Sequence, residues 1–140
     1  MKYNNLYILC VLLLSSCGDS GTATTDEPTP DTAIGLTLSK KTATTSSSGE
    51  SDTFTVKLKT KESVSVSISI SNTDAGSVYP TSLSFSESNW NVNQTVTVTG
   101  LCDAFHTSGT NKTTYNVVLS PSSANYSSTQ NKTVIVSDND

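Results

Sequence analysis

The sequence contains no arginine, so all 8 of its basic residues are lysines. The planar arginine side chain makes the two-point contacts to phosphates and bases that nucleic-acid-binding proteins favour. The 12 acidic residues also outnumber the lysines and give a formal net charge of −4. Both observations argue against a nucleic-acid partner.

Charged residues of either sign are scarce, at 14% of the chain against about 25% in typical soluble domains. Serine, threonine and asparagine must therefore cover much of the surface. This composition is common among exported β-proteins.

Cysteine and histidine are too few for a disulfide framework or a repeated metal motif, because the chain has 3 cysteines and 1 histidine. We expect Cys10 to be removed with an N-terminal export signal and Cys17 to be acylated, as argued below, which leaves Cys102 without an intrachain partner. Cys102 and His106 together suggest a small cysteine-dependent hydrolase or inhibitor as one alternative. No third orienting group is evident beside them, so we expect no enzyme and no catalytic residues.

The chain has no apolar run long enough to cross a bilayer of about 30 Å, because its longest run is Leu6–Leu14. Lys2 precedes this run, and the pattern predicts an export signal over residues 1–16. Leu14-Ser15-Ser16-Cys17 resembles a bacterial lipobox, which implies cleavage before Cys17 and lipidation of its thiol. An ordinary secretory signal is the alternative. We expect a membrane anchor at Cys17 and a location in the cell envelope, at the outer membrane or cell surface.

Cleavage there removes one lysine and no acid, so the net charge falls from −4 to −5. Residues 18–33 contain four acids, two prolines and no apolar periodicity, and we expect residues 17–33 to form a disordered tether. The remaining residues, 34–140, are enough for one domain.

From Ile34 onward, apolar residues alternate with polar ones, which is typical of half-buried strands. Clusters of serine, asparagine, glycine and proline separate seven such stretches, and no helix is evident. This all-β pattern predicts one seven-stranded antiparallel immunoglobulin-like β-sandwich. We expect Trp90 to pack in its core or at its edge. The predicted strands are centred on Leu36–Leu38, Phe54–Leu58, Val64–Ile70, Leu83–Phe85, Val96–Val98, Tyr115–Leu119 and Val134–Val136.

The run from Leu83 to Gly100 contains Asn89-Trp90-Asn91 and Gln94-Thr95-Val96-Thr97-Val98-Thr99-Gly100 and resembles the Calx-beta-like repeats of bacterial surface proteins. The resemblance implies a seven-stranded sandwich with acidic residues at one end that can bind calcium. The chain departs from that pattern at Leu101-Cys102-Asp103-Ala104, where one acid stands in place of several. The positions that match the family's acidic residues are Glu50, Asp103, Asp138 and Asp140, with Asp52 and Asp74 as neighbours. The tentative metal ligands are Glu50, Asp52, Asp103 and Asp138.

In an antiparallel sandwich, alternate loops fall at the same end, and here those loops carry Asp74, Asp103 and His106. This end faces away from the tether, so we expect a protein or glycan ligand to bind there. The leading hypothesis is a non-enzymatic surface lipoprotein with one adhesion or interaction module. A weak calcium-binding structural module is an alternative.

Overall fold

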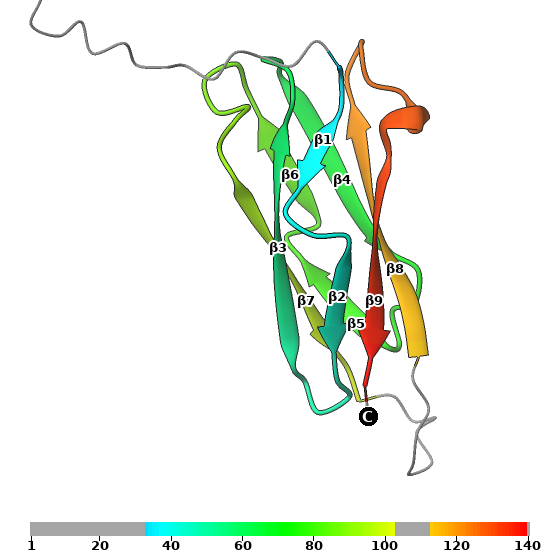
Figure 1. Ribbon diagram of the computed structural model, residues 1–140. Helices are drawn as coiled ribbons and strands as arrows, with labels where there is room; N and C mark the ends of the chain where they lie inside the picture. The colour runs from blue at the N-terminus through cyan, green and yellow to red at the C-terminus, as the bar shows by residue number, and fades with distance from the viewer. Residues whose placement is uncertain (1–32, 103–112, 140) are drawn as a thin grey trace, which may run out of the picture.

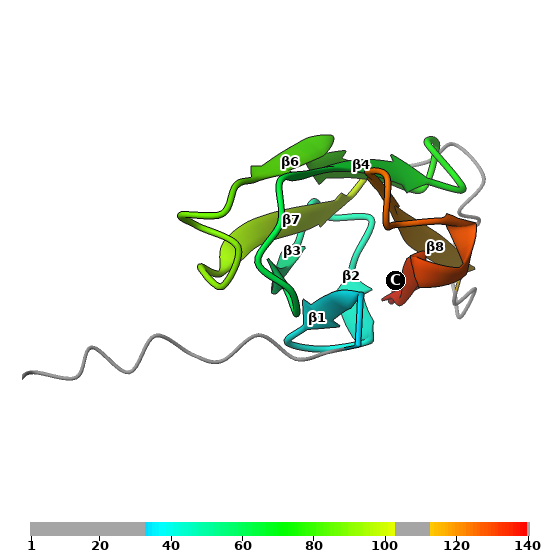
Figure 2. The same cartoon turned by 90° about the horizontal axis from the view of Figure 1, so that it is seen from above.

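A computed structural model describes residues 33–102 and 113–139, which form two β-sheets packed face to face (Figures 1 and 2). The predicted signal, Cys17 and nearly all of the tether lie outside these residues. The four-stranded sheet has the order β1 (Leu36–Leu38), β3 (Ser51–Leu58), β7 (Gln94–Gly100) and β5 (Gly76–Tyr79). The five-stranded sheet has the order β2 (Thr42–Thr45), β9 (Lys132–Asp138), β8 (Thr113–Ser122), β4 (Val64–Ile70) and β6 (Ser82–Phe85).

Helical structure in the described part of the chain is limited to one 3₁₀ turn, η1 (Ser128–Gln130). None of the described residues forms a helix with the length and apolar character of a membrane span.

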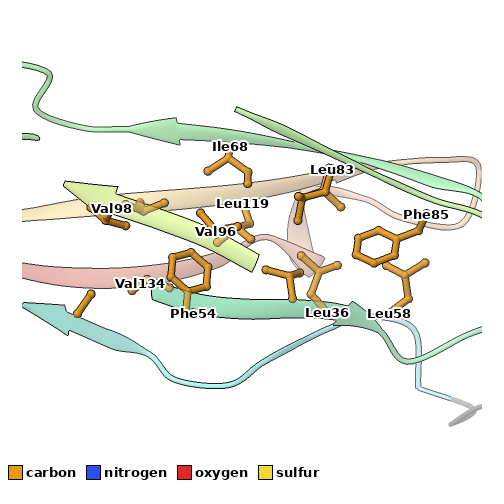
Figure 3. Close-up of a cluster of buried hydrophobic side chains, with 14 of the residues drawn as sticks. Leu36, Phe54, Leu58, Ile68, Leu83, Phe85, Val96, Val98, Leu119 and Val134 are labelled. Atoms are coloured by element: carbon orange, nitrogen blue, oxygen red, sulfur yellow. The ribbon is translucent and has the colours of Figure 1, made fainter. Parts of the chain in front are cut away.

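A single hydrophobic core fills the space between the sheets (Figure 3). Its side chains come from alternate strand positions, so Phe54, Val56 and Leu58 on β3 face inward while their neighbours face outward. Trp90 is buried with an exposed fraction of 4%, which confirms its predicted place in the core. In the described part of the chain, 20 buried apolar residues form this core, and they extend from Leu36 to Val136.

The all-β sandwich is confirmed, but it has nine strands rather than the seven predicted. The two additional strands are β2 and β5. Their sequences, Thr-Ala-Thr-Thr and Gly-Ser-Val-Tyr, contain too few large apolar residues to show alternation. The prediction of a purely antiparallel arrangement is also wrong at one pairing, because β2 runs parallel to β9, with Thr42 opposite Ile135 and Thr45 opposite Asp138.

The additional strands arise where the chain crosses from one sheet to the other. After β1 pairs with β3, the chain crosses and pairs with β9 as β2. After β5 pairs with β7, it crosses again and pairs with β4 as β6. All four edge strands are consequently only 3 or 4 residues long, which limits the open sheet edge that each one presents.

Candidate functional site

The loops 46–50 and 71–75 and the end of β9 lie at the same end of the sandwich, as strand parity predicted (Figure 1). Glu50 and Asp74 are exposed there, whereas Asp138 is fully buried. Asp103, His106 and Asp140 lie outside the described residues. The structure therefore places Glu50, Asp74 and Asp138 at this end, and it leaves Asp103, His106 and Asp140 untested.

Asp138 belongs to a buried polar cluster with Thr45 and Tyr115. The Thr45 hydroxyl donates a hydrogen bond to Oδ1 of Asp138 at 3.0 Å and lies 3.1 Å from the Tyr115 hydroxyl. Burial raises the pKa of Tyr115, the Thr45 hydrogen bond lowers it, and the nearby Asp138 raises it, so the net pKa lies above 10.0. Oδ2 of Asp138 is buried and has no hydrogen-bond partner. This oxygen is the group in the cluster that is left to accept a hydrogen bond or to contact a cation.

Sheet register and strand alternation produce this cluster. Thr45 lies opposite Asp138 across the parallel β2–β9 pair, and both residues occupy inward positions. Tyr115 points inward from β8, next to β9.

Two glycines that face each other across the β5–β7 pair, Gly76 and Gly100, leave room beside this cluster. A Cβ atom at Gly76 would lie 2.3 Å from the Tyr115 hydroxyl oxygen, and one at Gly100 would lie 2.2 Å from the backbone oxygen of Ser46. Any larger residue at either position would therefore displace packed atoms.

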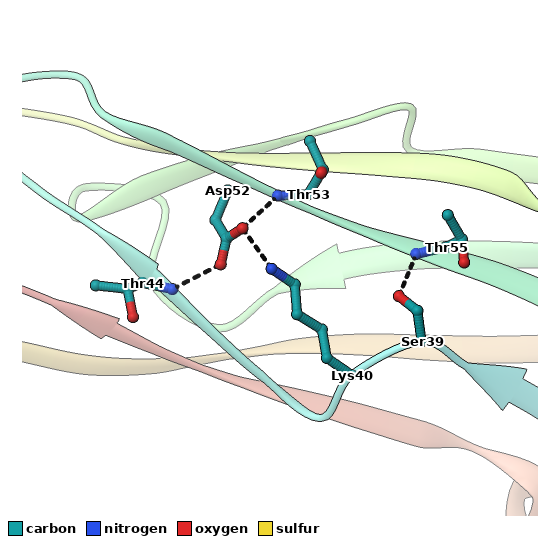
Figure 4. A network of polar contacts seen from close by, with 6 residues as sticks. All are labelled: Ser39, Lys40, Thr44, Asp52, Thr53 and Thr55. Atoms are coloured by element: carbon teal, nitrogen blue, oxygen red, sulfur yellow. Dashed lines mark hydrogen bonds and ion pairs between the residues drawn. The ribbon is translucent and has the colours of Figure 1, made fainter.

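Asp52 lies farther along β3 and connects the two sheets (Figure 4). Its Oδ1 accepts hydrogen bonds from the Lys40 ammonium group and, at 2.8 Å, from its neighbour Thr53 N–H. Its Oδ2 accepts one from the Thr44 N–H at 3.1 Å. Partial burial raises the pKa of Asp52, but these hydrogen bonds and the Lys40 charge outweigh that effect and hold the pKa below 3.8. Both carboxylate oxygens of Asp52 are therefore used in hydrogen bonds that hold the fold together.

The four predicted metal ligands do not form a complete site within the described residues. Across residues 33–102 and 113–139, no three histidine, cysteine, aspartate or glutamate side chains converge in a way that could hold a metal ion. Calcium takes 6–8 oxygen ligands. Asp138 contributes one unpartnered oxygen, and any further acidic ligand would have to come from Glu50 or from residues outside the described part.

Cys102, the thiol of the predicted Cys–His pair, is free and exposed. His106, the proposed base, lies outside the described residues. The described part of the chain contains no histidine, so it brings no imidazole to this thiol.

Sequence reasoning assigned no role to Lys40 or Thr45 and treated Tyr115 only as a core residue. Lys40 reaches Asp52 because the chain crosses between sheets just before β2, and local alternation gives no sign of this crossing. Thr45 is the last residue of β2, and Tyr115 lies near the start of β8. Their inward positions would have indicated a buried polar pair only if β2 had been recognised in the sequence.

No protein-family model matches the chain, and no curated protein matches its sequence. Several solved structures share its fold. SSP-19, an MSP-domain protein like family member of Caenorhabditis elegans, aligns with a TM-score of 0.56 and 16% identity, covering 74% of this chain and 99% of SSP-19. The periplasmic chaperone SfaE aligns with a TM-score of 0.57 and 10% identity, covering 74% of this chain and 56% of SfaE. The YadV chaperone aligns with a TM-score of 0.55, 10% identity and the same 74% coverage.

The chain spans 56% of SfaE and 50% of YadV, about half the length of these chaperones. At such low identities, the comparisons establish the fold alone. The described part of the chain is an immunoglobulin-like β-sandwich of the kind found in MSP-domain proteins and periplasmic chaperones.

Proposed function

We propose that this chain is a non-enzymatic envelope lipoprotein that displays one Calx-beta-like β-sandwich as an interaction or adhesion module. The observation that carries the proposal is a sandwich with a single hydrophobic core, which follows a lipobox-like sequence and an acidic spacer in the chain. The lipobox-like sequence directs acylation of Cys17, and the attached lipid anchors the chain in the membrane. The spacer holds the sandwich away from the lipid at the outer membrane or cell surface.

The polar side chains of the sandwich support a binding role rather than a catalytic one. Asp52 joins the two sheets, and the Thr45 hydroxyl bonds to both Tyr115 and Asp138 inside the fold. The fold itself occurs in binding proteins, since one similar structure is the Salmonella enterica SafA pilin in complex with the SafB chaperone, with a TM-score of 0.52. A protein ligand at the exposed loops, around Asp74, Asp103 and His106, fits this role, and a glycan is the alternative ligand.

A lipid-labelling experiment on the full-length chain tests the anchor. We expect cells fed a clickable fatty acid to label the native protein, and detergent phase partition to place it in the detergent phase. Cys17→Ala should abolish both results because the acylated thiol is lost, whereas the matched control Cys102→Ala should preserve them. An unchanged detergent fraction for Cys17→Ala would show that the chain is not a lipoprotein.

A weak calcium-binding structural module is the second candidate, and the unpartnered Oδ2 of buried Asp138 favours it. A cation at this oxygen would neutralise a carboxylate that is otherwise shielded from water. Glu50, Asp103 and Asp140 are the acidic residues of the surrounding sequence that would complete the ligand set.

A further inference from the structure

A groove of about 420 Å³ opens at the seam of the sandwich, between β1 and the first residues of β9. Leu36 and Leu38 supply apolar lining, and three lysines, Lys41, Lys59 and Lys132, surround it. Among residues 33–102 and 113–139, no acidic residue lines the groove, although the chain as a whole is acidic. Its volume falls within the range of ordinary small-ligand sites, about 300–1,000 Å³.

The seam is open because the chain leaves the four-stranded sheet after β1 and joins the other sheet farther along, at Thr42. Alternate residues of β9 face the core, and Lys132 is in line with the buried Val134 and Val136, yet it is exposed. Lys41 is likewise in line with the inward-facing Ala43 and Thr45 of β2, and it too is exposed. Two lysines therefore occupy inward positions at a place where the second sheet does not cover them.

The charge of the groove calls for an anionic ligand. Neither Lys41 nor Lys132 has a hydrogen bond or ion pair with another described side chain, whereas the adjacent Lys40 is paired with Asp52. Several ammonium groups around one groove attract a carboxylate together, and dissolved salt screens this attraction.

The backbone of the groove also has an unpaired edge. Gly35 accepts a hydrogen bond from the Lys59 N–H and the Ser39 N–H donates to Thr55, so these residues face β3. Backbone direction alternates along a strand, and the N–H and C=O groups of Leu36 and Leu38 therefore face away from β3, at the open edge of the sheet.

The same alternation applies on the opposite wall. The Ile135 N–H donates to Lys41, so the backbone groups of Thr133 point to the same side, just before the β2–β9 pairing begins. Unpaired strand groups of this kind are templates for an added strand.

We propose that this groove binds an extended acidic segment of a partner protein, which adds as a short strand to the open edge of β1. Its carboxylates pair with Lys41 and Lys132, and its apolar side chains cover Leu38, which is only half-buried. The proposal deepens the interaction role proposed above and rests on it.

Peptide binding to residues 18–140, which remain after the predicted cleavage and the removal of the lipidated Cys17, measures this site directly. This range contains every described residue of the hydrophobic core. The probe is a fluorescent seven-residue peptide of alternating glutamate and valine, with a lysine–valine peptide of the same length as its control. We expect the acidic peptide to bind in 50 mM salt and its affinity to fall at least about tenfold in 500 mM salt. The lysine–valine peptide should not bind.

The double variant Lys41→Gln/Lys132→Gln should bind the acidic peptide at least about tenfold more weakly than the native chain does. It removes two ammonium groups and keeps side chains of similar length. Lys57→Gln is the matched control, since Lys57 lies on the outward face of β3 and does not line the groove. The affinity of this variant for the acidic peptide should stay within about twofold of the native value. Methylating alternate backbone nitrogens of the probe blocks one strand edge without changing charge and should also abolish binding.

Equal affinity of the double variant and the native chain would overturn the groove assignment, and equal affinity of the methylated probe would overturn strand addition. Tighter, lysine-dependent binding of heparin would assign the groove to an anionic glycan instead. If residues 33–140 bound the probe at least about tenfold more tightly than residues 18–140, the chain's own acidic segment would be the occupant. Each of these results leaves the lipid-labelling test of Cys17 unaffected, so failure of the groove is distinguishable from failure of the anchor.

Discussion

The carboxylate of Asp52 on β3 accepts a hydrogen bond from the backbone N–H of Thr44 on β2, and these two residues belong to opposite sheets. A second side chain makes the equivalent connection at the other edge, where Gln94 of β7 donates from Nε2 to the carbonyl of Ser84 on β6 at 2.8 Å. Each bridge lies beside a point where the chain crosses between sheets. The two polar bridges thus close the sandwich where strand pairing is interrupted.

We expect Asp52→Ala to lower the free energy of unfolding by about 1–2 kcal/mol at pH 7, because it removes the acceptor for Thr44, Thr53 and Lys40 together. Chemical denaturation gives the value. Asp74→Ala is the control, since Asp74 is exposed and its side chain bridges no strands; it should change stability by no more than about 0.5 kcal/mol. A loss in Asp52→Ala no larger than in this control would show that the bridge does not stabilise the fold.

The low pKa of Asp52 makes its contribution depend on acidity. Because the folded pKa lies below the unfolded value near 3.8, the contribution is complete at neutral pH and is lost as the pH falls below about 4, through the folded pKa. The stability difference between the native chain and Asp52→Asn should therefore shrink between pH 7 and pH 2.5. Denaturation curves at both pH values measure it, and a difference that grew on acidification would contradict the assignment.

Core positions should be much more sensitive than their outward neighbours. Ile68→Ala and Val98→Ala should each lower the free energy of unfolding by about 1–4 kcal/mol, through lost burial and a residual cavity. Ser67→Ala should stay within about 0.5 kcal/mol, because the Ser67 hydroxyl is exposed and water can replace its bond to Ser120. The reverse order in denaturant would mean that the strand register is shifted by one residue.

The paired glycines should not tolerate a methyl group. Gly100→Ala should lower the free energy of unfolding by about 1–3 kcal/mol, since the new Cβ meets the Ser46 backbone, which cannot turn aside as a side chain can. Ser77→Ala, on the exposed face of β5, is the control and should change little. Thermal unfolding of both variants decides the point, and equal melting temperatures would refute the steric argument.

Calcium binding at Asp138 would appear as a change in melting temperature. Under the second candidate function, 5 mM calcium should raise the melting temperature of residues 18–140 relative to the same sample in chelator, because an ion that binds only the folded state stabilises it. Asp138→Asn should remove that increase, and Glu62→Gln, at the other end of the sandwich, should preserve it. Identical melting curves with calcium and with chelator would exclude the site.

The central strands were predictable because their alternating valine, isoleucine and phenylalanine residues show directly which face is buried. Val64–Ile70 is an example, with every second residue facing the core up to Ile68. The edge strand β2 was not predictable, because its pairing with β9 is decided by tertiary contacts rather than by its own sequence. The roles of Asp52 and Asp138 depend on that pairing, so the sequence indicated acidic residues near one end without revealing that one bridges the sheets and the other is buried.

The parallel pairing of β2 with β9 also determines how the domain responds to a pulling force. The described chain enters the sandwich at β1, near one end, and leaves β9 at the opposite end (Figure 1). Tension between the two ends would slide these strands past each other along their length. The hydrogen bonds from Thr42 to Thr45 would then carry the load together instead of opening one at a time, so the domain should resist extension along this axis.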